Sequence, residues 1–314
     1  MQYRNLLNSK LKLSEIGLGC ASYWGKKHFS EKKAIDVVHH AIDSGVNYFD
    51  TGHSYSGGHA EIRLGKALRS KALQCKATQS QELIISSKVG TRVGTMGRVY
   101  KDFSAAWIKQ SCDQSLRQLQ VDHLPIFFLH GPNPEDFNED VYQALNELKQ
   151  AGKIGLFGVN AFDDNIIELA VESEQFQAVM LDYNIFTAQR SQTLESLHQR
   201  GVDVMVAGAI AGGLYDRRFK QFKGLKSIWY WLRALKNNKA LMQQAKRFDF
   251  LNDQPSATAI QLALAYVLNN QQFCSALVGT TSVAHLDEIL QTDINQLNAE
   301  LISQITTIQT AMGS

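Results

Sequence analysis

The chain has 314 residues with a formal net charge of +2, and 44% of them are hydrophobic and 20% charged, an ordinary globular balance. So small a net charge argues against nucleic acid or a membrane surface as a partner. The sequence contains no run of about eighteen apolar residues, the length that is needed to cross a membrane. The N-terminus has no apolar signal core, so we expect a cytoplasmic protein.

The expected elements begin with a β-hairpin, in which Tyr3–Leu7 and Leu11–Leu13 flank a polar turn. Short apolar runs then alternate with longer segments of helical period. The expected strands are Ile16–Gly19, Tyr48–Thr51, Leu83–Lys88, Ile126–His130, Leu156–Asn160, Ala178–Asp182, Val202–Ala207 and Ala276–Gly279. The expected helices are Ser30–Ser44, Ala60–Ser70, Ser104–Gln118, Glu139–Ala151, Asp163–Ser173, Ser191–Arg200, Ser256–Asn269, Ser282–Gln291 and, last, Gln296–Met312. Ser30 and Ser104 are typical helix N-caps, and Gly45, Gly152 and Gly201 are typical of the residue that ends a helix.

This alternation predicts a parallel sheet with helical crossovers. A doubly wound open sheet and a closed barrel both satisfy it. Eight strands, and no Gly-x-Gly-x-x-Gly after any of them, favour the barrel, because Gly17-Leu18-Gly19-Cys20 lacks the third glycine. We therefore expect an α/β fold, a (β/α)8 TIM barrel with an N-terminal β-hairpin and a C-terminal extra helix, in one domain over residues 1–314.

Two connections are unusually long, from Val89 to Phe103 and from Ala211 to about Leu235. Both follow strands, and in a barrel such loops lie on the catalytic face. They and the loop after the first strand supply candidates for substrate contacts: Trp24, Met96, Tyr100, Tyr215, Phe219, Trp229 and Trp231.

The cysteines are Cys20, Cys75, Cys112 and Cys274, which lie far apart in the sequence. They form no Cys-x-x-Cys pair and have no metal-ligand spacing with histidine. We therefore expect free thiols and no bound metal.

Three of the expected strands carry an ionisable side chain at or near their end. Asp50 ends the second strand, with Tyr55 five residues further on, Lys88 ends the third and His130 the fourth. Any one of them alone is more often structural than catalytic. Together at one mouth of a barrel they predict general acid catalysis of hydride transfer. Tyrosine is a weak acid, with a pKa near 10, and a neighbouring ammonium favours its ionised form. In this arrangement Lys88 supplies that charge, Asp50 orients Lys88, and His130 binds the carbonyl oxygen.

At these residues the chain resembles the aldo-keto reductases, over essentially its whole length. The tetrad of that family falls on Asp50, Tyr55, Lys88 and His130. Further matching segments are Asn47-Tyr48-Phe49-Asp50-Thr51, Leu64-Gly65-Lys66-Ala67-Leu68, Gly158-Val159, Tyr183-Asn184, Gly212-Gly213-Leu214, Leu262–Leu268, Val278-Gly279-Thr280-Thr281-Ser282 and Leu286-Asp287-Glu288. Asp102-Phe103-Ser104 and the segment from Ser111 to Leu119 are similar to the L-galactose and L-fucose dehydrogenase subgroup.

The resemblance implies a nicotinamide cofactor held at the strand ends. The matching positions are Gly19, Cys20, Asp50, Asn160, Ala161, Met180, Gly208, Ile210, Gly212, Leu214, Gly279, Thr280, Thr281, Ser282, His285 and Glu288. Ala161, Met180 and Ala207 depart from the usual Asn, Gln and aromatic residue. Gly279 and His285 stand where NADP-preferring members often have cations, while the hydroxyls of Thr280, Thr281 and Ser282 remain. We expect NADP, with NAD as the alternative.

The expected function is NAD(P)-dependent oxidoreduction of an aldehyde, ketone or sugar. Trp24, Tyr55, Tyr100 and His130 are the expected substrate contacts, and the protein is expected to be a monomer or small homo-oligomer. A nicotinamide-binding redox sensor or regulatory subunit, similar to the potassium-channel β-subunits, is the alternative. A barrel with metal-assisted chemistry has no ligand cluster in the sequence to support it.

Overall fold

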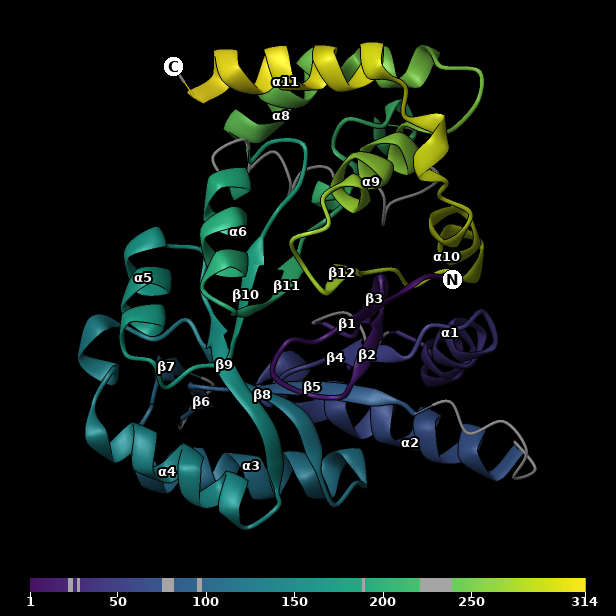
Figure 1. The fold of residues 1–314 in the computed structure, drawn as a ribbon. Coiled ribbons are helices and arrows are strands. Elements are labelled where there is room, and N and C mark those ends of the chain that lie inside the picture. Colours follow the sequence, from purple (N-terminus) through teal and green to yellow (C-terminus); the bar gives the residue numbers. More distant parts are fainter. Residues whose placement is uncertain are drawn as a thin grey trace.

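Eight parallel strands close into a barrel, as the sequence predicted (Figure 1). The computed structural model describes residues 1–21, 25–26, 29–74, 82–94, 98–187, 190–220 and 239–313. The barrel strands are β3 (Ile16–Gly19), β4 (Tyr48–Asp50), β5 (Ile84–Val89), β8 (Leu124–His130), β9 (Ile154–Asn160), β10 (Ala178–Asp182), β11 (Asp203–Ala207) and β12 (Ser275–Val278). They follow one another in chain order, and β12 pairs with β3 to close the ring. Because all are parallel, their C-terminal ends form one mouth.

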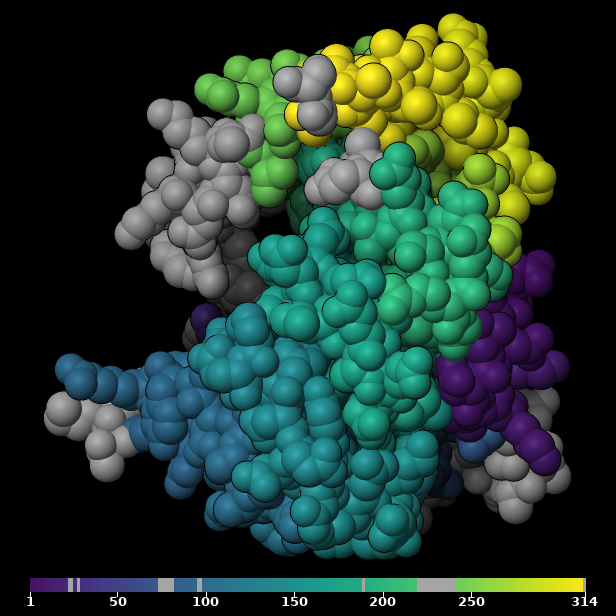
Figure 2. All heavy atoms as spheres, turned by 60° about the vertical axis from the view of Figure 1, so that its left-hand side comes forward, coloured from purple at the N-terminus to yellow at the C-terminus, as the bar shows by residue number. Residues whose placement is uncertain are grey.

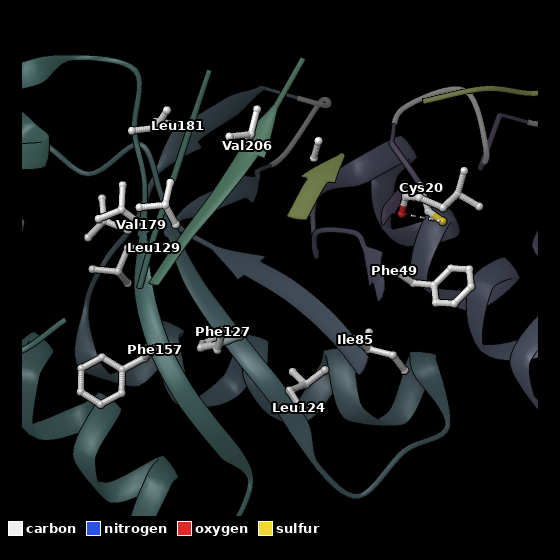
Figure 3. Close-up of a cluster of buried hydrophobic side chains, with 14 of the residues drawn as sticks. Cys20, Phe49, Ile85, Leu124, Phe127, Leu129, Phe157, Val179, Leu181 and Val206 are labelled. Carbon is white, nitrogen blue, oxygen red and sulfur yellow. Dashed lines mark hydrogen bonds between the residues drawn. The ribbon is translucent and has the colours of Figure 1, made fainter. Parts of the chain in front are cut away.

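Side chains alternate between the barrel interior and the layer beneath the helices. Along β8, Ile126 and Phe128 belong to the interior cluster, whereas Phe127 and Leu129 belong to the outer one. All four are fully buried, and each such burial contributes about 1.5–3 kcal/mol relative to exposure. Figure 3 shows part of the outer cluster, with Phe127, Leu129 and Phe157. This two-residue period places every second strand residue toward the barrel axis.

Helices surround the barrel. They are α1 (Glu31–Asp43), α2 (His59–Gln74), α3 (Ala105–Leu119), α4 (Glu139–Gln150), α5 (Asp164–Glu172), α6 (Arg190–Gln199), α9 (Ala259–Asn269) and α10 (Val283–Leu290). The predicted N-caps are confirmed, because the side chains of Ser30 and Ser104 accept from the backbone N–H three residues on. Gly45, Gly152 and Gly201 have φ of 90°, 69° and 73°, the left-handed conformation that ends helices.

Helix α9 begins later than predicted, at Ala259 instead of near Ser256. Thr258 is its N-cap, and its hydroxyl accepts from the N–H of Gln261 while the Gln261 side chain accepts from the N–H of Thr258. This capping box satisfies two backbone donors and fixes where the helix starts.

The N-terminal hairpin of β1 (Tyr3–Asn5) and β2 (Lys12–Ser14) covers the end of the barrel opposite the mouth. The buried carboxylate of Asp203, at the start of β11, accepts from the backbone N–H groups of Leu7 (2.6 Å) and Asn8 (3.0 Å). Leu6 and Leu13 join the interior cluster. The hairpin therefore covers one end of the barrel strands, opposite their C-terminal mouth.

The first long connection contains a second hairpin that the sequence analysis missed. It pairs β6 (Thr91–Val93) with β7 (Val99–Lys101) next to the end of β5. In the second long connection, short 3₁₀ helices at Ala211–Gly213 and Arg217–Lys220 precede residues 221–238, which lie outside the described part.

The predicted C-terminal extra helix is α11 (Ala299–Gly313), the yellow helix at one end of the molecule (Figures 1 and 2). Beside it lie α8 (Lys239–Ala245) and a 3₁₀ segment at Lys246–Asp253, neither of which was predicted. Leu301 and Ile305 of α11 pack against Phe248 and Leu262 in a separate apolar cluster. No described helix is long and apolar enough to cross a membrane.

Candidate active site

The four predicted catalytic residues come together at the mouth, on three neighbouring strands. Asp50 and Lys88 lie at the ends of β4 and β5, and His130 ends β8, which pairs with β5. Tyr55 starts a 3₁₀ turn after β4. The loop before this turn is tied to β5, because Thr51 N–H donates to Ser86 O (3.0 Å) and His53 N–H donates to Lys88 O (3.2 Å).

Lys88 is the centre of the group. Its ammonium donates to the Asp50 carboxylate and to the Thr51 carbonyl (2.9 Å), and it lies 5.0 Å from the centroid of the Tyr55 ring. The Tyr55 ring meets His130 edge-on, with centroids 5.7 Å apart and an interplanar angle of 85°. Lys88 and Asp50 are buried, whereas Tyr55 and His130 are partly exposed. A ligand at the mouth can therefore reach Tyr55 and His130 while the ion pair stays covered.

The charge states of Lys88 and His130 follow from their surroundings. Burial lowers the pKa of Lys88, but the charges of Asp50 and Tyr55 outweigh burial and hold it above its ordinary value. Burial lowers the pKa of His130 to about 3, and the positive charges of Lys88 and Lys101 add to this effect. At neutral pH the site therefore combines an ammonium ion with a neutral imidazole.

Ser86 is part of this arrangement and was missed by the sequence analysis. Its hydroxyl donates to Asp50 Oδ1 (2.6 Å) and lies 2.8 Å from the Tyr48 hydroxyl inside the barrel. The two-residue period of β5 was the available signal, because it puts Ser86 on the same face as Lys88.

A second set of polar side chains lies behind the loop that connects β4 to Tyr55. The buried Glu61 accepts from Ser87 (2.5 Å), and its other oxygen lies 3.7 Å from Nδ1 of His53. The His53 ring stands edge-on to Trp107 of α3, with centroids 5.5 Å apart. His53 therefore packs behind this loop.

The predicted cofactor positions occupy the rest of the mouth. Apart from Asp50, they lie on or after β9, β10, β11, β12 and β3, which are consecutive in the barrel, while the tetrad comes from β4, β5 and β8. Asn160 Nδ2 and Ala161 N–H both donate to Met180 O at 3.0 Å. Cys20 N–H donates to Asp50 O (2.7 Å), which joins the two parts of the mouth. The ends of β9 and β10 and the end of β3 are thus tied to their neighbours by hydrogen bonds at this part of the mouth.

The backbone of this rim is open where glycines were predicted to contact the cofactor. A Cβ built on Gly208 or Gly212 would meet no atom within 4 Å, and one on Gly279 would meet only backbone, 3.8 Å away at Gly19 O. Next to Gly279, the Ser282 side chain caps the start of α10 and accepts from His285 N–H. Exposed peptide groups and a helix N-terminus suit a pyrophosphate.

Glu288 lies on α10 and forms an ion pair with Arg218, which comes from the loop after β11. Arg218 donates to the Glu288 carboxylate at 2.5 and 3.2 Å and also pairs with Asp216. Arg218 lines a cavity of about 570 Å³ together with Thr258 and Gln261 at the start of α9. No pattern in the sequence pairs residues 218 and 288, so only the fold reveals this contact.

The predicted substrate contacts differ in their exposure to solvent. Tyr100 lies on β7 with 45% of its surface exposed. Tyr215 is buried, and its hydroxyl donates to Ile210 O (3.1 Å). Trp24, Met96, Trp229 and Trp231 lie outside the described residues.

Cys20, Cys112 and Cys274 are free and buried, and no described cluster of His, Cys, Asp and Glu could hold a metal ion.

The chain is also similar to known proteins over most of its length. Residues 15–310 match the model of the aldo/keto reductase family. The chain is 28% identical over 298 residues to the uncharacterized oxidoreductase YqkF of Bacillus subtilis (strain 168), a match that covers 93% of this chain and 90% of YqkF.

Two solved structures share the fold. Aldo-keto reductase AKR11C1 from Bacillus halodurans, in its holo form, superposes with a TM-score of 0.80 at 28% identity and covers 98% of this chain and 96% of its own. The glycerol dehydrogenase AKR11B4 from Gluconobacter oxydans has a TM-score of 0.79 at 20% identity, with 99% and 95% coverage, and supports the fold alone. The chain therefore belongs to the aldo/keto reductase family and is an NAD(P)H-dependent oxidoreductase acting on carbonyl groups.

Proposed function

We propose that the protein moves hydride reversibly between a nicotinamide cofactor and an aldehyde, ketone or sugar, with Tyr55 as general acid and base. One observation carries this proposal. Lys88, held by Asp50, places its ammonium 5.0 Å from the centroid of the Tyr55 ring, and His130 meets the same ring edge-on.

Each member of the tetrad has a defined task. The carbonyl oxygen gains negative charge as its carbon accepts hydride, and Tyr55 gives that oxygen a proton. The Lys88 ammonium stabilises the tyrosinate that remains, and Asp50 keeps Lys88 charged and in place. His130 is neutral at pH 7 because its pKa is about 3. It therefore offers one N–H to the carbonyl oxygen without adding a charge that would compete with Lys88.

The rim residues fit a nicotinamide cofactor, which supplies the hydride when bound. Asn160 Nδ2 is committed to Met180 O, so the amide oxygen of Asn160 is the group that would accept from a carboxamide. The open backbone at Gly208, Gly212 and Gly279 would lie along the pyrophosphate. Thr280, Thr281 and Ser282 add hydroxyls at the start of α10.

We further propose NADP as the cofactor, with Arg218 as the cation at its adenosine end. Arg218 contacts Glu288 and lines the adjoining cavity, near the positions where the sequence lacks the usual cations. Arg218 is shared by two carboxylates, so a 2′-phosphate must compete with Glu288 for it. Fluorescence titration with NADPH and NADH tests this. Arg218→Gln is expected to weaken NADPH binding more than NADH binding. Arg200→Gln, which breaks the surface ion pair to Glu168 and lies outside this cavity, is the matched control.

The reaction is tested by turnover of a panel of aldehydes, ketones and aldoses with both cofactors. Tyr55→Phe is expected to reduce kcat by about 10²–10⁴-fold. Tyr142→Phe is the control, because Tyr142 lies on α4 and packs against Phe176. A loss of less than about tenfold in Tyr55→Phe would refute the acid role. Tight cofactor binding without turnover of any carbonyl would favour the alternative, a redox sensor or regulatory subunit.

A further inference from the structure

Lys101, at the end of β7, joins the rim hairpin to the catalytic centre. Its ammonium donates to the backbone carbonyl of His130. The hairpin follows β5 directly, and Asp102 N–H donates to Gly90 O (3.2 Å) at its base. It therefore starts from the strand that carries Lys88 and contacts the end of the strand that carries His130.

The backbone around this contact is closely fitted. Gly131 bends away from β8 with φ of 63°, and its N–H donates to Asn160 O (2.8 Å). A Cβ built on Gly131 would lie 3.2 Å from the Lys101 ammonium. Lys101 thus lies against the turn that ends β8, and its bond to the His130 carbonyl fixes the peptide from which the imidazole projects.

The remaining contacts hold the hairpin itself in place. Arg92 of β6 pairs with Asp102 (2.8 Å) and lies over the Trp107 ring, 4.6 Å from its centroid. Lys101 lies 5.8 Å from the ring centroid of Phe103. Among the described residues, no carboxylate lies within 4.0 Å of the Lys101 ammonium, so its main partner is the carbonyl of His130.

We propose that Lys101 is a positioning residue of the active site, which orients His130 through its backbone carbonyl and makes the hairpin β6–β7 part of the catalytic arrangement. This rests on the proposed role of His130 in carbonyl reduction. Tyr100 precedes Lys101 and is exposed on the same hairpin. A substrate that contacts Tyr100 would therefore contact the strand from which Lys101 reaches His130.

The charge of Lys101 has a separate effect on the imidazole. The groups that face His130 are Tyr55 from the loop after β4, Lys88 from β5 and Lys101 from β7, while Asp136 acts on Lys101 from the other side. Lys88 is neutralised by Asp50, whereas Lys101 has no such partner among the described residues. Removal of the Lys101 charge should therefore make His130 easier to protonate.

The experiment compares Lys101→Met, Lys101→Arg and Lys101→Gln with the wild type and with Lys109→Met. Lys109 lies on α3 and pairs with Glu147 at 2.5 Å, so it controls for the loss of a surface ammonium. The measurements are kcat and KM for a carbonyl substrate that the wild type reduces, the Kd of NADPH, and histidine NMR spectra from pH 7 to 4. Thermal melts in the same buffers establish that each variant is folded.

Lys101→Met is expected to lose about tenfold or more in kcat, since misplacement by about 1 Å can cost 10²-fold, while the Kd of NADPH stays within about twofold. Lys101→Arg retains a charged donor and should remain within about threefold of the wild type. In Lys101→Met the fraction of protonated His130 at pH 4 should be larger than in the wild type, because one of the positive charges that lower the pKa of His130 is gone.

Lys101→Gln separates orientation from charge, because it keeps an N–H donor without the charge. It should raise the protonated fraction of His130 while kcat stays within about threefold of the wild type. If Lys101→Met does not fold, Lys101→Gln and Lys101→Arg still test both parts. The proposal is overturned if Lys101→Met keeps wild-type kcat, or if Lys101→Arg is as impaired as Lys101→Met. A wild type without carbonyl turnover would instead refute the proposed function and leave the NMR shift to test Lys101.

Discussion

Asp50→Asn is the most informative perturbation of the site, because it removes one charge and hardly changes the shape. The Asp50 carboxylate holds two donors, the Lys88 ammonium on Oδ2 and the Ser86 hydroxyl on Oδ1 (2.6 Å). An asparagine offers one oxygen and one NH2 in their place. Whichever way its amide is turned, one of the two donors faces N–H groups.

The cost follows from burial. The side chains of Lys88 and Asp50 are only 1% and 8% exposed. Removal of one partner of such a pair costs about 3–5 kcal/mol when the remaining charge stays buried. Lys88 can avoid part of this cost by losing its proton, because burial lowers its pKa and the opposing charge of Asp50 is gone. Tyr55 then loses its cationic neighbour, and we expect kcat/KM to fall about 10²–10³-fold at pH 8, equivalent to about 3–4 kcal/mol.

The folding stability and the activity of Asp50→Asn should change with pH in opposite directions. In Asp50→Asn the pKa of Lys88 lies below its unfolded value, so the unfolded chain binds this proton more tightly. The stability of the variant relative to the wild type therefore falls as pH drops below about 10, where an unfolded lysine becomes charged. The activity should change in the opposite direction and recover as pH falls from about 9 toward 6, because Lys88 regains its charge.

The assay is kcat/KM across this pH range, with urea unfolding at each pH. Asp113→Asn is the control, because Asp113 pairs with Lys153 at 2.6 Å and both side chains are 39% exposed. Such a surface pair contributes about 0–1 kcal/mol. If Asp50→Asn kept kcat/KM within about threefold of the wild type, with an unchanged pH profile, the assignment of Lys88 as the charge that supports Tyr55 would be refuted.

Three further predictions concern stability and reactivity. His130 has a pKa of about 3 in the folded chain and about 6.5 in the unfolded chain, so it costs the wild type stability as pH falls below about 6.5. Urea melts should show that His130→Phe reduces this acid-induced loss by about 2.7 kcal/mol at pH 4.5, which is roughly 1.4 kcal/mol for each pH unit below 6.5, and equal losses would contradict it. Burial raises the pKa of Cys112 and of Cys274 to about 12 and raises that of Cys20 well above its ordinary value. The native Cys75→Ser variant should therefore resist iodoacetamide at pH 8 while all its thiols react in urea, and rapid native labelling would refute their burial. In Gly158→Ala the new Cβ would lie 2.1 Å from Ala178 O, a backbone atom, so a loss of about 3 kcal/mol or more is expected in urea melts, and wild-type stability would show that β9 and β10 can separate.

The sequence predicted the barrel because each strand and helix carries its own local signal. Strands β3 and β10 have the predicted bounds, and Ser30 and Ser104 cap their helices as expected. These features depend on a few neighbouring residues, namely the period of apolar side chains and one capping hydroxyl. The tetrad was found for a related reason, since parallel strands bring every strand end to one mouth.

The features that the sequence did not reveal depend on contacts between distant segments. The hairpin β6–β7 has strands of three residues each, too short for a periodic pattern. The bond from Lys101 to His130 spans 29 residues, and the pair of Arg218 and Glu288 spans 70. Neither contact has a local signal, because each depends on how one long connection folds over its neighbour.

The departures at Ala161 and Met180 are compatible with an intact tetrad, because the two parts of the mouth lie on different strands. Asn160 Nδ2 and Ala161 N–H both bind the carbonyl oxygen of Met180, not its side chain. That side chain is 1% exposed and packs in the barrel interior with Leu156 and Met205. A change of residue type at position 180 therefore preserves the backbone acceptor that orients Asn160. The side chain at position 180 therefore affects the packing of the barrel interior, whereas the proposed contact of Asn160 with the cofactor depends on the backbone of β10 and the proposed proton transfer by Tyr55 depends on β4, β5 and β8.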